Sequence, residues 1–201
     1  MIVNKNFYDI YVKINTNFED IMKIRINNIK NEFNLKNMSI EKIIDEYFVE
    51  IFSWSVLPYS LLNEISNIII NNNCNIILDP CCGNAFHTYL FETFTELECL
   101  TYDIQDEKDS WTKITEIDCL KIWEDIKNHH NICLLLSWID YEELCLKLLD
   151  KYNGNIILSI GNYHGRSPKY LKELNKKYKL YKSYELSMPW NLNESIEIYI
   201  R

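Results

Sequence analysis

The chain has 201 residues, of which 47% are hydrophobic and 25% are charged. This length suits a single buried core and is too short for two full domains. The formal net charge of −8 argues against a large basic surface for nucleic acid, because phosphate contacts need clustered Lys and Arg.

Nothing in the sequence indicates a membrane partner. No run of about 18 uninterrupted apolar residues occurs, which is the length that a membrane-spanning helix needs. The N-terminal stretch MIVNKNFYDIYVK is too polar for the apolar region of a signal peptide. We therefore expect a soluble, intracellular protein of the cytoplasm.

The first third of the chain is expected to be a mainly helical extension. Residues 1–38 show no clean hydrophobic period and are expected to form a strand or a helix. Ser39 is a suitable N-cap for a helix over 39–52, and Pro58 suits the first turn of a second helix that ends at 71–73. We expect residues 1–73 to form this extension, with lid helices packed on a core of residues 74–201.

The pattern changes at residue 74 to short apolar runs that alternate with helical periods. This alternation is typical of a parallel sheet with helices on both faces. The predicted strands cover residues 75–79, 97–103, 114–118, 131–138 and 155–161. The predicted helices cover residues 84–94, 119–130, 141–152 and 167–177.

The chain ends in a different pattern. Two extended runs, at 178–188 and 195–201, are joined by too few residues for a crossover helix, so we expect an antiparallel hairpin. The predicted fold is therefore α/β, with a doubly wound, seven-stranded, mostly parallel sheet and a C-terminal antiparallel hairpin. With the helical N-terminal extension, it forms one structural domain.

The stretch ILDPCCGNAF, residues 77–86, follows the first predicted strand of this sheet. In open α/β sheets, ligands bind outside the carboxyl ends of the strands where the strand order reverses. The stretch lacks the G-x-G-x-x-G of a pyrophosphate loop, and Asp79 would repel a pyrophosphate. An aspartate here suits a cationic ligand, and Gly83 allows a close approach of the backbone. The alternative is an ordinary turn between strand and helix.

Two further acids follow the next two predicted strands. Asp103 stands roughly 20 residues after the glycine loop, where a carboxylate can bind both hydroxyls of a ribose. Asp118 follows the third strand. A single acid of this kind is more often a helix cap, but three at successive strand ends favour a ligand site.

The order of elements and these motifs resemble the class I S-adenosylmethionine-dependent methyltransferases. The loop is similar to the D-P-x-C-G-x-G form of many DNA and RNA methyltransferases, which Asp79, Pro80, Cys82 and Gly83 match. Ala85 departs from that form at its last glycine, and Cys81 takes the place of a glycine in the more common acid-x-G-x-G-x-G form. The resemblance implies S-adenosyl-L-methionine as cofactor, bound by Asp79, Cys81, Gly83, Asp103, Ile104 against the adenine, Asp118 at the adenine amino group, and Ser137.

The resemblance is weaker at the fourth strand. Its end reads SWIDY, where amino-group methyltransferases carry [DNS]-P-P-[YFW], so that the substrate class does not follow from this motif. Asp140 and Tyr141 are the candidates for orienting or deprotonating the nucleophile, although Asp140 could instead cap the next helix. His164, in the loop GNYHGRSP, is a candidate base near pH 7 or a surface histidine without a role.

Trp residues flank the predicted core and are candidates for a lid. The segments FSWSVLPYS and MPWNLNES resemble elements of uncharacterised methyltransferase-like proteins. This resemblance implies a lid that contains Trp54 and Pro58, and a place for Trp190 at the substrate mouth. Either Trp could instead pack in the core.

Three functions follow from these observations. The first is a methyltransferase with an unidentified acceptor, which could be a small molecule, a protein or a nucleic acid. The second is a catalytically inactive binding or regulatory module of the same fold. The third, a metal or redox protein that uses Cys81 and Cys82, has little support: none of the seven cysteines forms a C-x-x-C pair, adjacent cysteines bridge only through a strained ring, and no metal is expected.

The segment from Lys169 to Lys182 interleaves basic and aromatic residues. Such a segment could contact nucleic acid. More often it is the solvated face of a helix followed by a strand.

Overall fold

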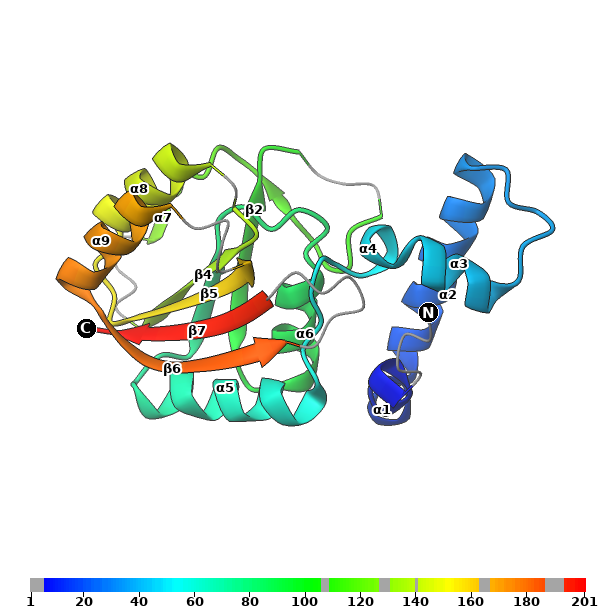
Figure 1. The fold of residues 1–201 in the computed structure, drawn as a ribbon, viewed down its shortest axis with the longest axis horizontal. Helices are drawn as coiled ribbons and strands as arrows, with labels where there is room; N and C mark the ends of the chain where they lie inside the picture. The colour runs from blue at the N-terminus through cyan, green and yellow to red at the C-terminus, as the bar shows by residue number, and fades with distance from the viewer. Residues whose placement is uncertain (1–5, 106–108, 127–130, 140, 163–166, 187–193) are drawn as a thin grey trace.

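The computed structural model describes all residues except 1–5, 106–108, 127–130, 140, 163–166 and 187–193. Its centre is one seven-stranded sheet with the order β3-β2-β1-β4-β5-β7-β6 (Figure 1). The strands are β1 (Ile76–Asp79), β2 (Glu98–Asp103), β3 (Thr115–Glu116), β4 (Ile132–Ser137), β5 (Ile156–Asn162), β6 (Lys179–Leu186) and β7 (Glu194–Ile200).

The strand directions agree with the sequence prediction. The pairs β1–β2, β1–β4, β2–β3 and β4–β5 are parallel, whereas β7 is antiparallel to both β5 and β6. The predicted α/β class, the seven strands and the C-terminal antiparallel hairpin are therefore confirmed. The third strand is shorter than predicted, since only Thr115 and Glu116 pair with β2.

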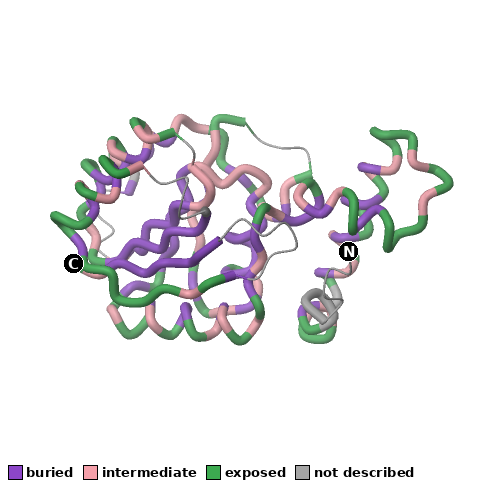
Figure 2. The backbone as a smooth tube through the Cα atoms, in the orientation of Figure 1, coloured by how far each residue is buried: buried purple, intermediate pink, exposed green. Residues whose placement is uncertain are grey.

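Helices cover both faces of the sheet (Figure 1). On one face lie α5 (Tyr59–Asn71) and α6 (Phe86–Phe94). On the other lie α7 (Trp123–Ile126), α8 (Glu142–Lys151) and α9 (Pro168–Lys177). Neighbouring residues of one strand point to opposite faces, so Ile77 packs with α5 and α6 while Ile76 and Leu78 pack under α7, α8 and α9. The described residues of β1, β4, β5 and β7 are mostly buried, whereas β6 is mostly exposed at the sheet edge (Figure 2).

The N-terminal third is helical in the described residues. It contains α1 (Asn6–Ile14), α2 (Thr16–Glu32), α3 (Ile40–Glu46) and α4 (Phe48–Ile51). Ser39 caps α3 as predicted, but the single helix expected over 39–52 is wrong. Tyr47, with φ −119° and ψ 32°, separates α3 from α4, and this change of direction buries Phe48 and Ile51. Pro58 precedes the first turn of α5 and serves as its N-cap residue.

An aromatic cluster joins the N-terminal helices to α6. Phe18 on α2 is fully buried, and its ring centroid lies 5.1 Å from that of Trp111, in a tilted arrangement, and 6.2 Å from that of Phe94, edge to face. Arg25 donates from Nε to the carbonyl oxygen of Ile51 across 2.7 Å, and its guanidinium lies over the Trp111 ring. These contacts join α2 to the end of α6, to Trp111 and to the end of α4.

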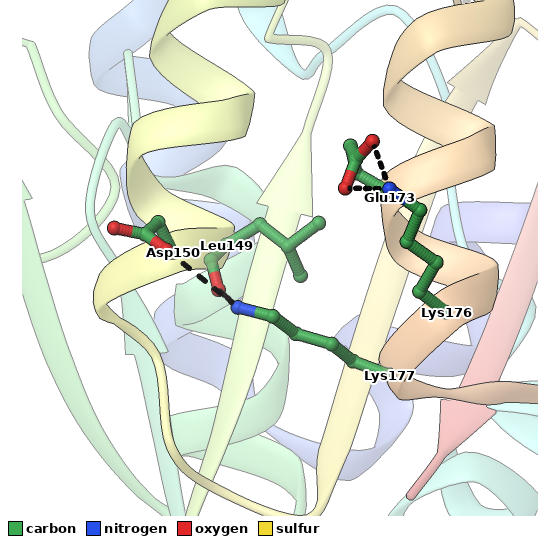
Figure 3. Close-up of polar contacts among 5 residues, drawn as sticks. All are labelled: Leu149, Asp150, Glu173, Lys176 and Lys177. Atoms are coloured by element: carbon green, nitrogen blue, oxygen red, sulfur yellow. Dashed lines mark hydrogen bonds and ion pairs between the residues drawn. The ribbon is translucent and has the colours of Figure 1, made fainter.

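The lysine-rich segment from Lys169 to Lys182 is largely engaged with neighbouring acids. Lys176 contacts Glu173 within α9, and Lys177 reaches the Leu149 carbonyl and the Asp150 carboxylate on α8 (Figure 3). Lys182 pairs with Glu64 on α5. These pairs favour the interpretation of the segment as a solvated face. Among the described residues, no helix is long and apolar enough to cross a membrane.

Candidate functional site

The carboxyl ends of β2, β1 and β4 lie side by side, because the sheet order places β1 between the other two strands. Asp79, Asp103 and Ser137 are the last residues of β1, β2 and β4. The chain moves outward from β1 to β3 in one direction and from β4 to β5 in the other. The strand order therefore reverses between β1 and β4, where α/β sheets bind ligands.

Asp79 is a buried carboxylate that is only half satisfied. Its side chain is 1% exposed, and Oδ2 accepts a hydrogen bond from the Thr88 hydroxyl across 2.6 Å. Within the described residues, Oδ1 has no hydrogen-bond partner. Burial, together with the nearby charge of Asp103, raises the pKa of Asp79 to about 7, against the opposing effect of the Thr88 hydroxyl and the Cys81 amide. A cation at this site would favour the ionised form.

The loop after β1 uses two left-handed residues to turn into α6. Gly83 has φ 53°, and Ala85 has φ 61° and ψ 26° at the N-cap position of α6. Ala85 thus adopts a conformation that glycine reaches more easily. A Cβ added to Gly83 would have no heavy atom within 4 Å, so open space adjoins its Cα among the described residues. Asn84 anchors the loop by donating to the Phe52 carbonyl across 2.7 Å.

Asp103 ties the loop after β1 to the end of β2. Its Oδ2 accepts from the Gly83 N–H across 2.9 Å, and its Oδ1 accepts from the Ile104 N–H across 2.7 Å. Ile104 itself is 66% exposed, so its apolar side chain is available to a ligand. Asp79, Gly83, Asp103 and Ile104 therefore lie together at the ends of β1 and β2.

Asp118 has a local structural role. Its Oδ1 accepts a hydrogen bond from the Leu120 N–H across 2.9 Å. This bond closes a turn that precedes α7. The neighbouring Cys119 thiol is hydrogen-bonded to the Cys81 thiol, which links the loops after β3 and β1. Burial raises the pKa of both thiols, so they stay protonated near pH 7. Cys81 and Cys119 thus serve here as packing between two loops.

The end of β4 is shaped by Trp138, which has φ 52°. Its backbone N–H donates to the Ile160 carbonyl, and its indole Nε1–H donates to the Ser55 hydroxyl across 3.2 Å. The Trp138 ring lies 5.7 Å from the ring of Trp54, which remains 48% exposed. The segment around Trp54 and the end of β4 therefore meet through an aromatic pair and a hydrogen bond.

No family model and no curated protein match the chain. Among solved structures, the chain is similar to a "putative caffeoyl-CoA O-methyltransferase" from Staphylococcus aureus, with 15% identity over 89% of this chain and 100% of that one, at a TM-score of 0.52. The magnesium protoporphyrin IX methyltransferase of Synechocystis with bound SAH shares 10% identity over 71% of this chain and 82% of that one, at a TM-score of 0.48. An rRNA methylase of Streptococcus thermophilus shares 11% identity over 69% of this chain and 94% of that one, at a TM-score of 0.46.

The chain has the class I methyltransferase fold. In this fold, the buried Asp79 and the bridged Asp103 occupy the ends of the first two strands, where the resemblance implied the cofactor. Tyr141 is 75% exposed and precedes α8 as its N-cap residue, without a side-chain cap bond. Asp140, His164 and Trp190 lie outside the described residues.

Sequence reasoning missed one part of this methyltransferase fold, namely His87 in the first turn of α6. His87 is 5% exposed, with Nε2 2.9 Å from the Ser55 carbonyl oxygen and Nδ1 2.9 Å from the Ser137 hydroxyl. No spacing rule connects these three positions, because they are 32 and 50 residues apart. The available signal was a histidine at the start of a helix rich in aromatic residues, directly after the glycine loop.

Proposed function

We propose that the protein binds S-adenosylmethionine at the carboxyl ends of β1 and β2 and transfers its methyl group to an acceptor. The observation that carries this proposal is the bond between Gly83 and Asp103, with open space next to Gly83. This bond fixes a carboxylate beside a stretch of backbone that a ligand can approach closely. The fold, shared with solved methyltransferases, supports the same cofactor.

Asp103 has the hydrogen-bonding capacity to hold a ribose. An ionised carboxylate has about four lone-pair positions, and two backbone N–H groups use one on each oxygen. One acceptor position therefore remains on each oxygen for a ribose hydroxyl. Ile104, exposed next to Asp103, would pack against the adenine ring, and Asp118 would act near the adenine through the carboxylate oxygen that does not cap its turn.

Asp79 suits the cationic half of the cofactor. A buried carboxylate with an unpaired oxygen is unfavourable unless positive charge is supplied. The ammonium and sulfonium of S-adenosylmethionine would supply that charge. Because Asp79 is only 1% exposed, its carboxylate would attract these positive groups mainly through the low-dielectric protein interior, with little direct contact. Gly83 and Cys81 would line the path of the cofactor along the loop.

The bound cofactor supplies a methyl group already activated on a sulfonium, so the protein has to position the acceptor and exclude water. Ser137 and Tyr141 at the end of β4 would face the acceptor. Asp140 and His164, which lie outside the described residues, are the further candidates for accepting its proton. The acceptor itself stays open among small molecules, proteins and nucleic acids.

Isothermal titration with S-adenosylmethionine tests the proposal. Binding should be measurable below hundreds of micromolar cofactor, with circular dichroism of the same sample showing a folded protein. A folded protein that does not bind at that concentration would contradict the proposal. Transfer of labelled methyl from the cofactor into a cell extract, abolished by Asp79→Ala, would establish the enzyme.

A second candidate function is a binding or regulatory module without catalysis. Two observations favour it: alanine replaces glycine at the left-handed position 85, and Trp138 replaces the first proline of the usual motif after β4. This candidate predicts cofactor binding without labelled methyl in any fraction of the extract. The titration and the transfer assay together therefore separate the two functions.

A further inference from the structure

Two successive hydrogen bonds join three segments of the protein next to the proposed cofactor loop. They run from the carbonyl of Ser55 in the lid segment, through the ring of His87 on α6, to the hydroxyl of Ser137 at the end of β4. Both ring contacts of His87 measure 2.9 Å. The ring is 5% exposed, so it has little access to water.

The partners of His87 determine where its proton lies. A carbonyl oxygen can only accept, so Nε2 carries the hydrogen and donates it to Ser55. Burial lowers the pKa of His87 to about 4, which leaves the ring neutral near pH 7. A neutral ring with hydrogen on Nε2 has a lone pair on Nδ1. Nδ1 therefore accepts, and the Ser137 hydroxyl is the donor.

This assignment has a consequence for Ser137. Its single hydrogen is used toward His87, so only lone pairs of its oxygen remain for another molecule. Ser137 is partly exposed, at the end of the strand next to β1, and Trp138 follows it with its ring against Trp54. A molecule bound there would meet a hydrogen-bond acceptor whose direction is fixed from the protein side.

We propose that His87 is a positioning residue, which holds the Ser137 hydroxyl so that its oxygen accepts a hydrogen bond from the N–H or O–H of the methyl acceptor. This inference rests on the proposed methyltransferase function and narrows the class of its acceptor. An amine, amide or hydroxyl brings its own hydrogen and is accepted. A carboxylate, phosphate or thiolate would face the lone pairs of Ser137 and is disfavoured.

The Ser55 end of these two hydrogen bonds links the acceptor position to the lid. Ser55 follows Trp54 in the sequence, and its hydroxyl oxygen accepts a hydrogen bond from the indole N–H of Trp138. The orientation of Ser137 therefore depends, through the His87 ring, on the position of the Ser55 carbonyl. A change in His87 should alter acceptor use and leave the Asp79 and Asp103 side of the site intact.

Two substitutions of His87 separate its two contacts. His87→Asn places an amide oxygen near the position of Nδ1, where it can still accept from Ser137. His87→Gln reaches toward Ser55 with an amide N–H, but has no acceptor near Ser137. Ser137→Ala removes the hydroxyl itself. The cofactor affinity of His87→Asn and His87→Gln, measured by titration with S-adenosylmethionine, should stay close to that of the wild type.

The experiment measures transfer of labelled methyl from S-adenosylmethionine into the extract fraction that the wild-type protein methylates. We expect His87→Gln and Ser137→Ala to lower kcat/KM for that fraction about tenfold, and His87→Asn to recover most of the loss. Long-range ¹H–¹⁵N spectra should show His87 as the neutral ring with hydrogen on Nε2. This signal should be absent in His87→Gln, which assigns it.

Three outcomes would overturn the inference. These are wild-type rates in His87→Gln and Ser137→Ala, hydrogen on Nδ1 of His87 in the spectra, or cofactor binding by the wild type without transfer to any fraction. A labelled product on a carboxylate, phosphate or thiolate would overturn the acceptor class. Failure of the wild type to bind the cofactor is a separate result, which removes the proposed function together with this inference.

Discussion

The backbone N–H of Gly83 donates to Oδ2 of Asp103 across 2.9 Å and joins the ends of the two strands that would carry the cofactor. The two residues are 20 positions apart, and the parallel register of β1 and β2 brings them together. Because Gly83 has φ 53° and open space beside it, the same bond holds the loop in a shape that leaves room for a ligand. We therefore expect binding of the cofactor to depend on both residues of this pair.

Replacement of Asp103 by alanine should weaken binding of S-adenosylmethionine by about 1 to 3 kcal/mol, because the ribose loses its acceptors and the loop loses its anchor. Titration calorimetry measures this change. Asp150→Ala is the matched control, since Asp150 is an exposed acid on α8 that pairs only with Lys177 among its described ion pairs. Equal affinity in Asp103→Ala and the control would show that Asp103 does not hold the cofactor.

Gly83→Ala should affect binding more than folding. The new Cβ meets no heavy atom of the described protein, so the cost to folding is the left-handed backbone alone, about 1 kcal/mol. The methyl group would project into the space beside the loop, and we expect the cofactor affinity to fall about tenfold or more. Asn34→Ala is the control, because Asn34 has the same φ of 53° in the turn after α2. A loss of stability without a loss of affinity in Gly83→Ala would contradict the prediction.

Much of the fold was predictable from the sequence, because strand ends and helix faces follow short-range patterns. Asp79 and Asp103 could be placed at neighbouring strand ends from the hydrophobic runs before them. The helix break at Tyr47 was not predictable, since the apolar period continues through it and only tertiary packing of Phe48 and Ile51 explains the turn.

The candidate site was predictable where it depends on one segment and not where it depends on several. The contacts of His87 with Ser55 and Ser137 join three segments, and no local pattern specifies them. Trp138 adopts φ 52°, a conformation that its residue type disfavours and that its bonds to Ile160 and Ser55 maintain. Such long-range bonds are read from coordinates and not from spacing.

Asp79→Asn should make stability less dependent on pH. The pKa of Asp79 is raised to about 7 in the folded protein, from 3.8, so between these values the folded protein holds a proton that the unfolded chain has released. This group therefore stabilises the fold as pH falls and loses that contribution as pH rises through 7. Asparagine cannot ionise, so the stability of the variant relative to the wild type should rise as pH increases from 3.8 to about 7, by an amount on the order of a few kcal/mol, and stay constant above that pH.

Urea unfolding of both proteins from pH 5 to pH 9 measures this difference. The titration of His87 is common to both and cancels in the comparison. Parallel stability curves over this range would show that Asp79 is ionised throughout. The same variant should bind S-adenosylmethionine more weakly, because the buried negative charge is lost.

The N-terminal helices should unfold together with the sheet. Phe18 is fully buried and its ring packs against those of Trp111 and Phe94, so Phe18→Ala should cost about 3 to 5 kcal/mol. If residues 1–73 and 74–201 form one domain, far-UV circular dichroism and Trp fluorescence should show one coincident transition, shifted equally in the variant. Phe33→Ala is the control, because Phe33 is 47% exposed and its loss should cost less than about 1 kcal/mol. Two separate transitions, with only the first moved by Phe18→Ala, would instead make the N-terminal helices an independent unit.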